Sequence, residues 1–381
     1  MICDKEKCNG CFACNNICPK KAISMIEDNN GFIYPKIDTS KCINCNLCKK
    51  VCPSLNNPLF NKPDKCYAIQ NKDPKELSKS SSGGAATLFV NYFLQKNWIV
   101  YSSVYESGFR INHIRIKDKN NMNNMRGSKY VHSYINNTYA LAKKDLLNNK
   151  NVLFIGTPCQ IAGLKSFLIK DYDNLYTIDL ICHGVPSQSY LKDELTKKVS
   201  LKEIKDIKFR YNNTFAISIN DGHLLSTLND SLYYNAFMNG LIYRENCYSC
   251  IYAGPNRCSD ITIGDFWGLH ESSILYDKKD QGVSVVLINS TKGNELFDNI
   301  KNNSIYEERD ISEAIQGNSQ LRAPVKKPNN YDKFKRDYIK LGFEKSYKKN
   351  YYQYYLKNKI KNNSMIYKLY EEFRRKKYER K

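Results

Sequence analysis

Short apolar runs alternate with longer amphipathic or apolar segments from about residue 65 onward. Strands are expected at 66–70, 99–104, 113–116, 152–155, 175–181, 261–263 and 283–289. Helices are expected at 85–95 and 138–147, from Ile161 onward, and from a cap at Ser290 or Thr291 to Ile300. Strands that alternate with helices predict an α/β domain with a largely parallel central sheet. The loops after such strands gather at one sheet edge, where ligands bind.

The pattern differs at both ends of this region. Two short strands at 23–27 and 32–37 flank Asp28-Asn29-Asn30-Gly31, a hairpin turn signal. Residues 53–65 are rich in Asn and Pro and predict a connector. Residues 205–228 read as short alternating strands, and the chain after Pro328 becomes helical, basic and rich in tyrosine. We therefore divide the chain into an N-terminal module (1–57), a main domain (65–325) and a basic helical tail (326–381).

Two matching cysteine runs fill the N-terminal module. Both read C-x2-C-x2-C-x3-C-P, and the second repeats the first 34 residues on. In such runs three thiolates hold one iron–sulfur cube and the fourth ligates the other cube. One [4Fe–4S] cluster is therefore assigned to Cys8, Cys11, Cys14 and Cys52, and the second to Cys42, Cys45, Cys48 and Cys18. A zinc site or a disulfide framework would not need this crossed arrangement. The module is predicted to be an α+β, ferredoxin-like fold resembling bacterial two-cluster ferredoxins.

Composition narrows the class of protein and its compartment. The chain has 381 residues, of which 41% are hydrophobic, so it is expected to fold around a sizeable core. Fifteen cysteines would suit a secreted disulfide protein, but thiolates that hold iron must stay reduced. The N-terminus does not resemble a signal peptide, and no apolar run is long enough to span a membrane. We expect a protein of a reducing cytoplasm, in an anaerobe.

The formal charge of +21 is concentrated at the C-terminal end. Residues 326–381 hold 19 Lys/Arg and 6 Asp/Glu, a net charge of +13. No nucleic-acid motif accompanies this charge, so nucleic acid is not an expected partner. Apolar and aromatic residues lie among the basic ones at Ile360, Tyr367, Leu369, Tyr370 and Phe373. This pattern fits an amphipathic helix on an anionic membrane or an acidic partner, and equally a helix packed on its own domain.

A third cysteine group lies in the main domain. Cys247, Cys250 and Cys258 are spaced C-x2-C-x7-C and lack a fourth ligand. Cys182 or Cys159 could supply it, because both follow predicted strands and could reach the same sheet edge. A zinc site is the alternative for a general C-x2-C pattern. With two cubes upstream, a third [4Fe–4S] cluster that relays electrons is the more economical interpretation.

Six motifs occur in an order that resembles one family. They are Ser82-Gly83-Gly84, Gly127-Ser128-Lys129-Tyr130, Gly156-Thr157-Pro158-Cys159-Gln160, Cys182-His183-Gly184, the trio Cys247, Cys250 and Cys258, and Gly264-Asp265-Phe266-Trp267-Gly268. Together they resemble the coenzyme F420 hydrogenase/dehydrogenase β-subunit family, over roughly residues 65–321. The resemblance implies an FAD-binding α/β domain with its own iron–sulfur centre, which passes electrons between a deazaflavin and other redox partners.

These motifs supply the candidate site residues. The turn Ser82-Gly83-Gly84 could bring backbone N–H groups to the FAD pyrophosphate, or be an ordinary loop. Arg126 and Lys129 could meet phosphate or a reduced flavin anion, or be a solvated basic loop. The motif match adds Ser128, Tyr130 and Thr157 as cofactor contacts, and Gln160 and Asp265 as partners of the isoalloxazine edge. His183 could shuttle a proton, although a lone loop histidine is often structural. Cys159 starts a helix that favours a thiolate, so it could be a ligand, a residue beside the flavin, or merely buried.

The sequence thus predicts an iron–sulfur flavoprotein oxidoreductase that uses FAD and [4Fe–4S] clusters. The first hypothesis is that a hydride donor such as reduced coenzyme F420 delivers electrons to ferredoxin or a partner enzyme. The second is that ferredoxin drives reduction of an organic substrate, related to a glycan or an isoprenoid. The third is a non-catalytic electron-transfer subunit. Residues do not fix the direction, because cluster potentials depend on hydrogen bonds and exposure.

Overall fold

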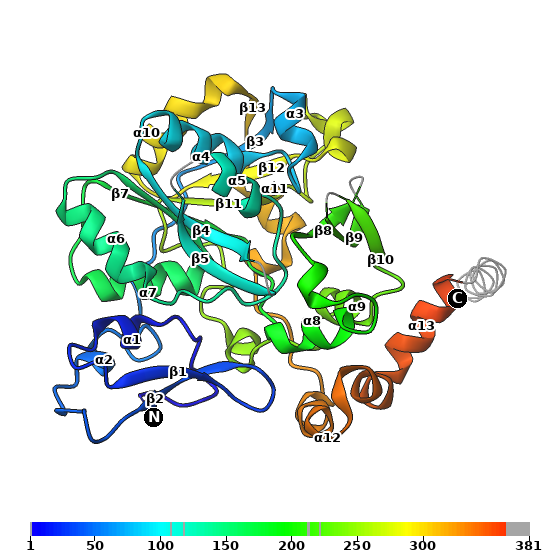
Figure 1. Ribbon diagram of the computed structural model, residues 1–381. Helices are drawn as coiled ribbons and strands as arrows, with labels where there is room; N and C mark the ends of the chain where they lie inside the picture. The colour runs from blue at the N-terminus through cyan, green and yellow to red at the C-terminus, as the bar shows by residue number, and fades with distance from the viewer. Residues whose placement is uncertain (1, 107–108, 117–118, 212–213, 221, 363–381) are drawn as a thin grey trace.

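The core of the chain is one eight-stranded mixed sheet (Figure 1). The computed structural model describes residues 2–106, 109–116, 119–211, 214–220 and 222–362. The strand order is β13-β3-β12-β11-β7-β6-β4-β5. In chain order these strands are β3 (Lys65–Asn71), β4 (Ile99–Glu106), β5 (Arg110–Ile116), β6 (Val152–Gly156), β7 (Leu175–Leu180), β11 (Ile261–Asp265), β12 (Ser284–Ile288) and β13 (Ser304–Arg309).

Only the centre of this sheet is parallel. β11, β7, β6 and β4 pair in parallel, whereas both flanks pair antiparallel. The α/β class is confirmed, but the expected largely parallel sheet is in fact mixed. The reason lies in the connections: β4 turns directly into β5 and β11 returns to β12 without an α-helix, and such short returns give antiparallel neighbours.

Helices cover both faces of the sheet, as the buried strands require. One face packs on α4 (Ala85–Gln95) and α10 (Thr291–Ile300), with Phe89 and Phe297 in a shared apolar cluster. The other face packs on α6 (Thr138–Leu147) and α7 (Pro158–Leu168). The predicted helices at 85–95 and 138–147 match these bounds. α7 begins three residues before the expected Ile161, because Pro158 is favoured at the first helical position and Thr157 with Gln160 forms a capping box.

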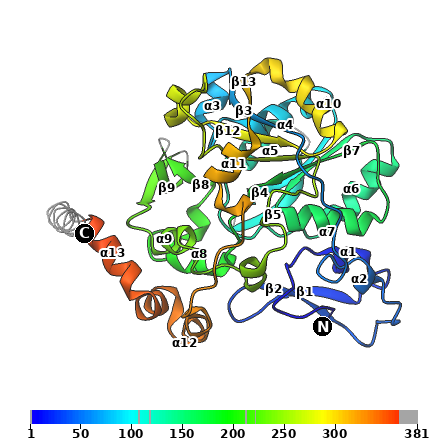
Figure 2. The same ribbon diagram turned by 180° about the vertical axis from the view of Figure 1, so that it is seen from behind.

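The N-terminal module packs beneath α7 and α6 in both views of the ribbon (Figures 1 and 2). It contains α1 (Ala13–Ile17), the hairpin β1 (Ile23–Glu27) with β2 (Ile33–Ile37), and α2 (Leu47–Lys50). The predicted hairpin is therefore confirmed. Arg244 ties the module to the main domain: its buried guanidinium donates to the carbonyls of Cys8 at 2.7 Å and Ile33 at 2.9 Å.

A second apolar cluster joins the small sheet to the C-terminal helices. The sheet consists of β8 (Ile207–Tyr211), β9 (Thr214–Ile219) and β10 (His223–Thr227). α8 (Gln188–Leu195), α9 (Leu232–Met238) and α12 (Tyr331–Asn350) share this cluster, followed by α13 (Tyr352–Asn362). The remaining α-helices are α3 (Pro74–Ser78), α5 (Lys119–Met125) and α11 (Ile311–Gly317). Within the residues described, no helix has the length and apolarity to cross a membrane.

Candidate cofactor site

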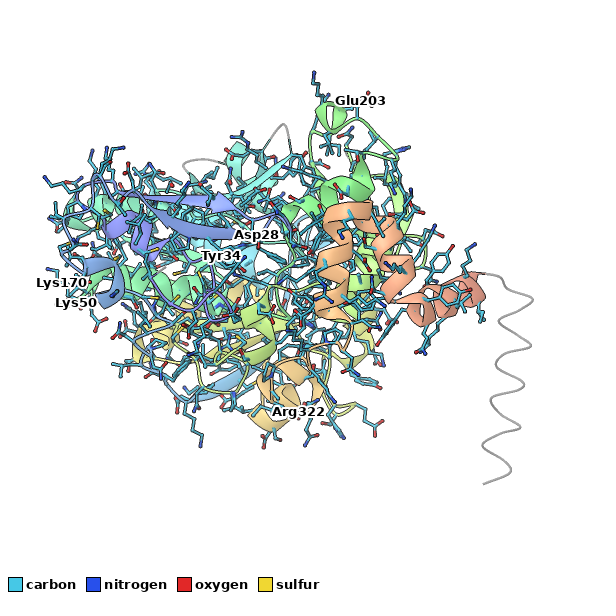
Figure 3. The ribbon with its side chains drawn as sticks, turned by 90° about the horizontal axis from the view of Figure 1, so that it is seen from below. Asp28, Tyr34, Lys50, Lys170, Glu203 and Arg322 are labelled. Atoms are coloured by element: carbon cyan, nitrogen blue, oxygen red, sulfur yellow. The ribbon has the colours of Figure 1, made fainter. Side chains whose placement is uncertain are left out.

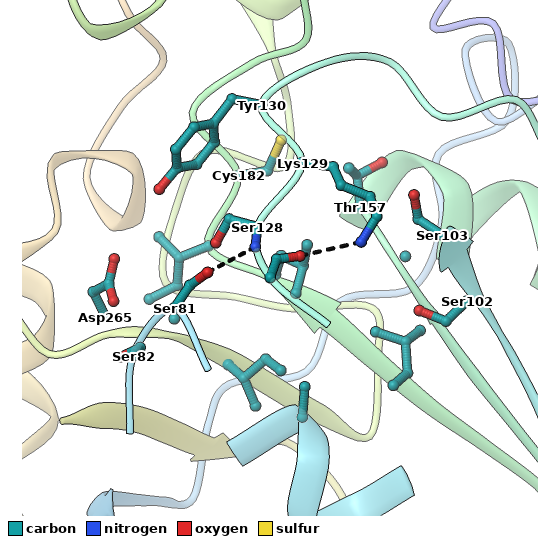
Figure 4. A pocket seen from close by; sticks show the side chains of 18 of the residues that line it. Ser81, Ser82, Ser102, Ser103, Ser128, Lys129, Tyr130, Thr157, Cys182 and Asp265 are labelled. Atoms are coloured by element: carbon teal, nitrogen blue, oxygen red, sulfur yellow. Dashed lines mark hydrogen bonds between the residues drawn. The ribbon is translucent and has the colours of Figure 1, made fainter. Parts of the chain in front are cut away.

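A cavity of about 270 Å³ opens where the central strands end. We call it the strand-end cavity. β6 contributes Gly156, β7 contributes Leu180, and β11 contributes Gly264 and Asp265. Segments 80–82, 84–87, 125–131 and 181–185 line much of the remaining wall (Figure 4). Of the residues predicted to bind cofactor, Ser82, Gly84, Arg126, Ser128, Lys129, Tyr130, Thr157, Gln160 and Asp265 line the cavity, and so does His183. Gly83 and Cys159 lie outside its lining.

The loop Ser82-Gly83-Gly84 is forced close to the sheet. A Cβ on Gly83 would lie 2.2 Å from the carbonyl oxygen of Ile69 and 2.5 Å from the amide nitrogen of Ser284, so only glycine fits there. Gly84 has φ of 82° and stands at the N-cap of α4, which no side chain caps. Ala85, Ala86 and Thr87 of the first turn of α4 line the cavity, and the cap residue Gly84 has no side chain to bond their N–H groups.

The loop around Lys129 is fastened to this turn. The backbone N–H of Ser128 donates to the Ser81 hydroxyl at 2.8 Å (Figure 4). Lys129 donates to the carbonyls of Met125, Gly127 and Arg126 at 2.7, 3.2 and 3.3 Å. Burial lowers the pKa of Lys129 to about 7, because the ammonium loses its hydration. Lys129 is half-buried in the cavity wall, which disfavours the alternative of a fully solvated basic loop.

Arg126 adds a second basic group to the same wall. Its guanidinium pairs with Glu76 of α3 and also donates to Asn123 at 3.0 Å. Its Nε is buried and has no partner among the described residues. An orphaned buried donor that lines a cavity is a position where an anionic ligand would be favoured.

Gln160 and Thr157 hold the start of α7. The Gln160 side chain accepts from the Thr157 backbone N–H at 2.9 Å and donates to the Ser133 carbonyl at 2.8 Å. These bonds fix the loop after β6, and they engage both ends of the amide. The role of Gln160 at a flavin edge stays a prediction, while its role as a helix cap is plain in the structure.

Asp265 belongs to a charged and aromatic network. Arg210 of β8 donates to Asp265 at 3.1 Å and to the Tyr130 hydroxyl at 3.3 Å. Its guanidinium also lies 3.5 Å from the centroid of the Phe215 ring. Burial raises the pKa of Asp265, and the Arg210 charge opposes that rise. Sequence reasoning missed Arg210, because a charged residue in a short alternating strand carries no signal of what it faces.

His183 lies in the cavity wall as expected. Burial, together with the charge of Arg210, lowers the pKa of His183 to about 4. The imidazole is therefore neutral at pH 7 and can accept or donate one hydrogen bond. A second histidine, His113 of β5, also lines the cavity, and its ring bonds Ser133 and the Ile155 carbonyl at 2.9 and 3.0 Å. The sequence placed His113 in a strand and gave no sign of this site.

The thiols of the first predicted cluster gather in the module. Cys8, Cys11, Cys14 and Cys52 all line one small cavity. Burial raises the pKa of Cys14 well above its usual value, and the charges of Cys8 and Cys52 raise it further. Cys3, to which we gave no role, lines the same cavity, and its thiol is hydrogen-bonded to the thiols of Cys8 and Cys52. These bonds are the main reason that the pKa of Cys8 falls to about 6 and that of Cys52 to about 7.

The second predicted cluster is the more exposed one. The Cys45 thiol is exposed, whereas Cys42, Cys48 and Cys18 are half-buried. Burial raises the pKa of Cys48, and the nearby charges of Cys45 and Cys42 raise it as well. The Sγ atom of Cys18 accepts from the Ala22 backbone N–H at 3.3 Å.

Five thiols of the main domain form a third group. After burial, the largest influence on the pKa of Cys182 is the charge of Cys159, and burial with these neighbours raises that pKa to about 12. Cys250, Cys182 and Cys159 likewise raise the pKa of Cys247. Burial raises the pKa of Cys258, and the charge of Cys159 contributes to that rise. The Cys258 thiol donates to the Pro158 carbonyl at 3.4 Å. Cys159 and Cys182 thus both act on the pKa of Cys247, so both stay candidates for the fourth ligand.

No group of three or more His, Cys, Asp or Glu side chains, in the part of the chain that the structure describes, gathers tightly enough to hold a single metal ion. The assignment of the cysteines therefore rests on their spacing in sequence and on these mutual effects.

The module touches the third group through α7. A Cβ on Gly163 would lie 2.9 Å from the Cβ and 3.0 Å from the Sγ of Cys11. Cys159 lies one helical turn before Gly163 on the same helix. Tyr139 and Tyr252 fill the same region, and thiols of both groups act on the pKa of each. Neither tyrosine was predicted, because the sequence does not show which residues lie between two distant cysteine groups.

Two family models match the chain. Residues 149–314 match the model for the C-terminal part of the coenzyme F420 hydrogenase/dehydrogenase beta subunit, and residues 7–56 match a 4Fe-4S dicluster domain. Over residues 149–314 the chain is F420 hydrogenase/dehydrogenase beta-subunit-like, and residues 7–56 are an N-terminal 4Fe–4S module. The resemblance drawn from the motifs is thereby confirmed. So is the iron–sulfur, electron-transfer character of this beta-subunit-like protein.

One solved structure is similar over most of the chain. It is a chain of the F420-reducing [NiFe] hydrogenase complex from Methanosarcina barkeri, with 18% sequence identity and a TM-score of 0.46. The match covers 76% of this beta-subunit-like protein and 92% of that chain. A likeness this distant supports no argument about the site.

Proposed function

We propose that the chain is an iron–sulfur flavoprotein oxidoreductase. In this proposal the strand-end cavity holds FAD, and reduced coenzyme F420 or a similar hydride donor is the substrate. Ferredoxin or a partner enzyme then takes up the electrons. When bound, the flavin supplies the exchange between a two-electron hydride and single electrons.

One residue carries this proposal. Cys182 lines the strand-end cavity and also belongs to the third thiol group, whose members act on its pKa. Cys11 of the module lies against Gly163 of α7, one helical turn after Cys159. In this proposal the cavity and the thiol groups form one series. A series that begins in a ligand cavity and continues through three thiol groups is what transfer from a hydride donor to a one-electron acceptor requires.

The residues of the cavity fit FAD. The uncapped start of α4 and the orphaned Nε of Arg126 are suited to a pyrophosphate. Lys129 can gain a proton beside an anion, because its pKa lies near neutrality. Asp265, held by Arg210, and the neutral His183 can hydrogen-bond a ring edge or donate and accept a proton.

The cysteines divide into three sets of candidate ligands. Cys8, Cys11, Cys14 and Cys52 would hold the first cluster, and Cys18, Cys42, Cys45 and Cys48 the second. Cys182, Cys247, Cys250, Cys258 and Cys159 include the four ligands proposed for a third. A cluster there would lie between the cavity and the module.

Reduction of a bound flavin tests the function. The protein should be purified without oxygen, its non-covalent flavin identified, and reduced deazaflavin added in a stopped-flow instrument. We expect the flavin absorbance to bleach first and the iron–sulfur absorbance to follow. NADH is the control donor, since the chain shows no convincing G-x-G-x-x-G turn. If reduced deazaflavin does not bleach the flavin but dithionite-reduced ferredoxin does, the ferredoxin-driven reductase hypothesis is favoured instead. If the purified protein contains no flavin, only the hypothesis of a non-catalytic electron-transfer subunit is left.

A further inference from the structure

The two cysteine runs differ in how far they face solvent. Cys8, Cys11 and Cys52 of the first set are each at most 8% exposed. The loop of the second run carries the exposed Cys45 and Ile43, whose side chain is 58% exposed. The first set also contacts α7 through Cys11, so it faces the interior. Within the described residues, the second run is therefore the more accessible of the two runs to an external redox partner.

The surface around this loop is basic. Between Pro19 and Ser54 the chain has six lysines and three acidic residues. Each acid is already engaged: Glu27 accepts from Tyr134, Asp28 pairs with Lys5, and Asp38 pairs with Lys41. No ion pair to another described residue involves the remaining lysines, Lys20, Lys21, Lys36, Lys49 and Lys50. Figure 3 shows Lys50 and Lys170 at the same edge of the molecule.

Exposed apolar side chains accompany the lysines. Besides Ile43, Leu55 is 49% exposed and Leu59 is 91% exposed. Protein interfaces commonly have an apolar centre and a polar rim. We use the name second-run face for a set of exposed residues of this module, which are Lys20, Lys21, Lys36, Ile43, Lys49, Lys50 and Leu55.

We propose that the second-run face docks a small acidic protein that carries one electron at a time. This inference rests on the proposed function and adds the site of the partner. In each encounter one electron passes between the carrier and the cluster held by Cys42, Cys45, Cys48 and Cys18. The carrier and the cluster change by one electron in opposite senses, and no bond or proton is exchanged. Charge complementarity favours this occupant over a second copy, because the chain itself has a net charge of +21.

Charge reversal at the second-run face tests the proposal. Lys49→Glu/Lys50→Glu changes two exposed lysines, and Lys340→Glu/Lys345→Glu makes the same charge change on α12. The probe is a purified acidic two-cluster ferredoxin, reduced beforehand and mixed with each protein in a stopped-flow instrument. At low ionic strength we expect the second-order rate constant to fall about tenfold or more for the first variant. The α12 variant should stay within about twofold, and high salt should remove the difference.

Separate measurements keep the proposal distinct from the proposed function. Iron content, dithionite bleaching and cluster midpoint potentials should be equal in all three proteins. Iron-free wild-type protein would refute the proposed function and the docking inference together. Normal iron with equal rates in both variants, or equal losses in both, would refute the docking inference alone. Binding of the second-run face to anionic vesicles but not to ferredoxin would likewise overturn the docking inference. So would a wild-type protein that forms dimers, if only Lys49→Glu/Lys50→Glu loses them.

Discussion

At the scale of single residues, Lys129 links the cavity to pH. Its ordinary pKa of 10.5 falls to about 7 on burial, so above pH 7 the folded protein holds it mostly as a neutral amine. The unfolded chain keeps that proton up to about pH 10.5. The unfolded state therefore binds more protons between these values, and Lys129 makes the free energy of unfolding rise with pH from about 7 to 10.5.

An anion in the cavity should reverse this shift, and Lys129→Met tests that. A phosphate or flavin anion favours the ammonium, so FAD binding at pH 8 should take up about one proton per chain. At pH 6 Lys129 is already charged, and no uptake is expected. Calorimetry in buffers of different ionisation enthalpy measures the uptake. Lys129→Met should abolish it, and Lys79→Met, at an exposed position, should retain it. Equal uptake in both variants would show that another group titrates.

Cys250 tests the third thiol group. Two clusters in the module account for about eight irons, and a third would give about twelve per chain. Cys250→Ser should lower the iron of anaerobically purified protein by about four. Cys66→Ser is the matched control, because Cys66 is a buried thiol in an apolar cluster of the sheet and belongs to none of the three thiol groups. One zinc with eight irons in the wild type would disprove the third cluster.

At the scale of elements, α7 joins the module to the main domain. In an exposed helix Ala is more stable than Gly by about 1 kcal/mol, which makes Gly163 costly unless space demands it. Cys11 leaves no space for a larger residue, because its Sγ would lie 3.0 Å from a Cβ added at position 163. Glycine at 163 therefore lets a ligand of the first cluster approach the helix that carries Cys159.

Gly163→Ala should disturb this approach. We expect a lower melting temperature, and slower electron transfer from the third group to the module in stopped-flow traces. Gly254→Ala is the control, because no atom lies within 4 Å of the position that its Cβ would take. The two substitutions are chemically identical and neither glycine has a positive φ. A Gly163→Ala protein as stable and as fast as wild type would mean that the contact is not close in solution.

Elements that carry a local signal could be predicted from the sequence, and those defined by distant contacts could not. The helices at 85–95 and 138–147 have apolar periodicity, and Asp28 to Gly31 fixes a hairpin. β13 and α8 were missed, since a half-exposed edge strand and a polar helix lack a clear pattern. Thr157 and Gln160 line the cavity because they follow the parallel strand β6, and Asp265 because it ends β11. The segments around Gly84 and Lys129 follow the antiparallel flank strands β3 and β5, so the parallel-sheet rule does not account for their place at the cavity. Arg210 and Tyr252 reach their sites only through tertiary packing.

At the scale of the whole molecule, the basic tail divides into two parts. The part that includes α12 packs into the core: Phe334 and Tyr347 are fully buried, and the Tyr347 hydroxyl donates to Asn235 at 2.6 Å. Tyr351 is buried too and donates to the Leu241 carbonyl at 2.9 Å. α13 lies beyond it and is mostly exposed. Of the apolar residues noted in the tail, Tyr367, Leu369, Tyr370 and Phe373 lie outside the described residues.

Truncation should therefore show a sharp boundary at Tyr351. Deleting 352–381 removes none of the fully buried residues of the cluster and only Tyr355 of those packed against it, so bound FAD, flavin reduction and melting temperature should stay close to wild type. Deleting 351–381 also removes the Tyr351 ring and its hydrogen bond, at a cost of about 3–5 kcal/mol for a buried aromatic side chain. Thermal melts and flavin absorbance of the two truncations measure this difference. Loss of FAD from the shorter deletion would show that residues beyond Tyr351 support the cavity, and equal melting temperatures would show that Tyr351 contributes little to the core.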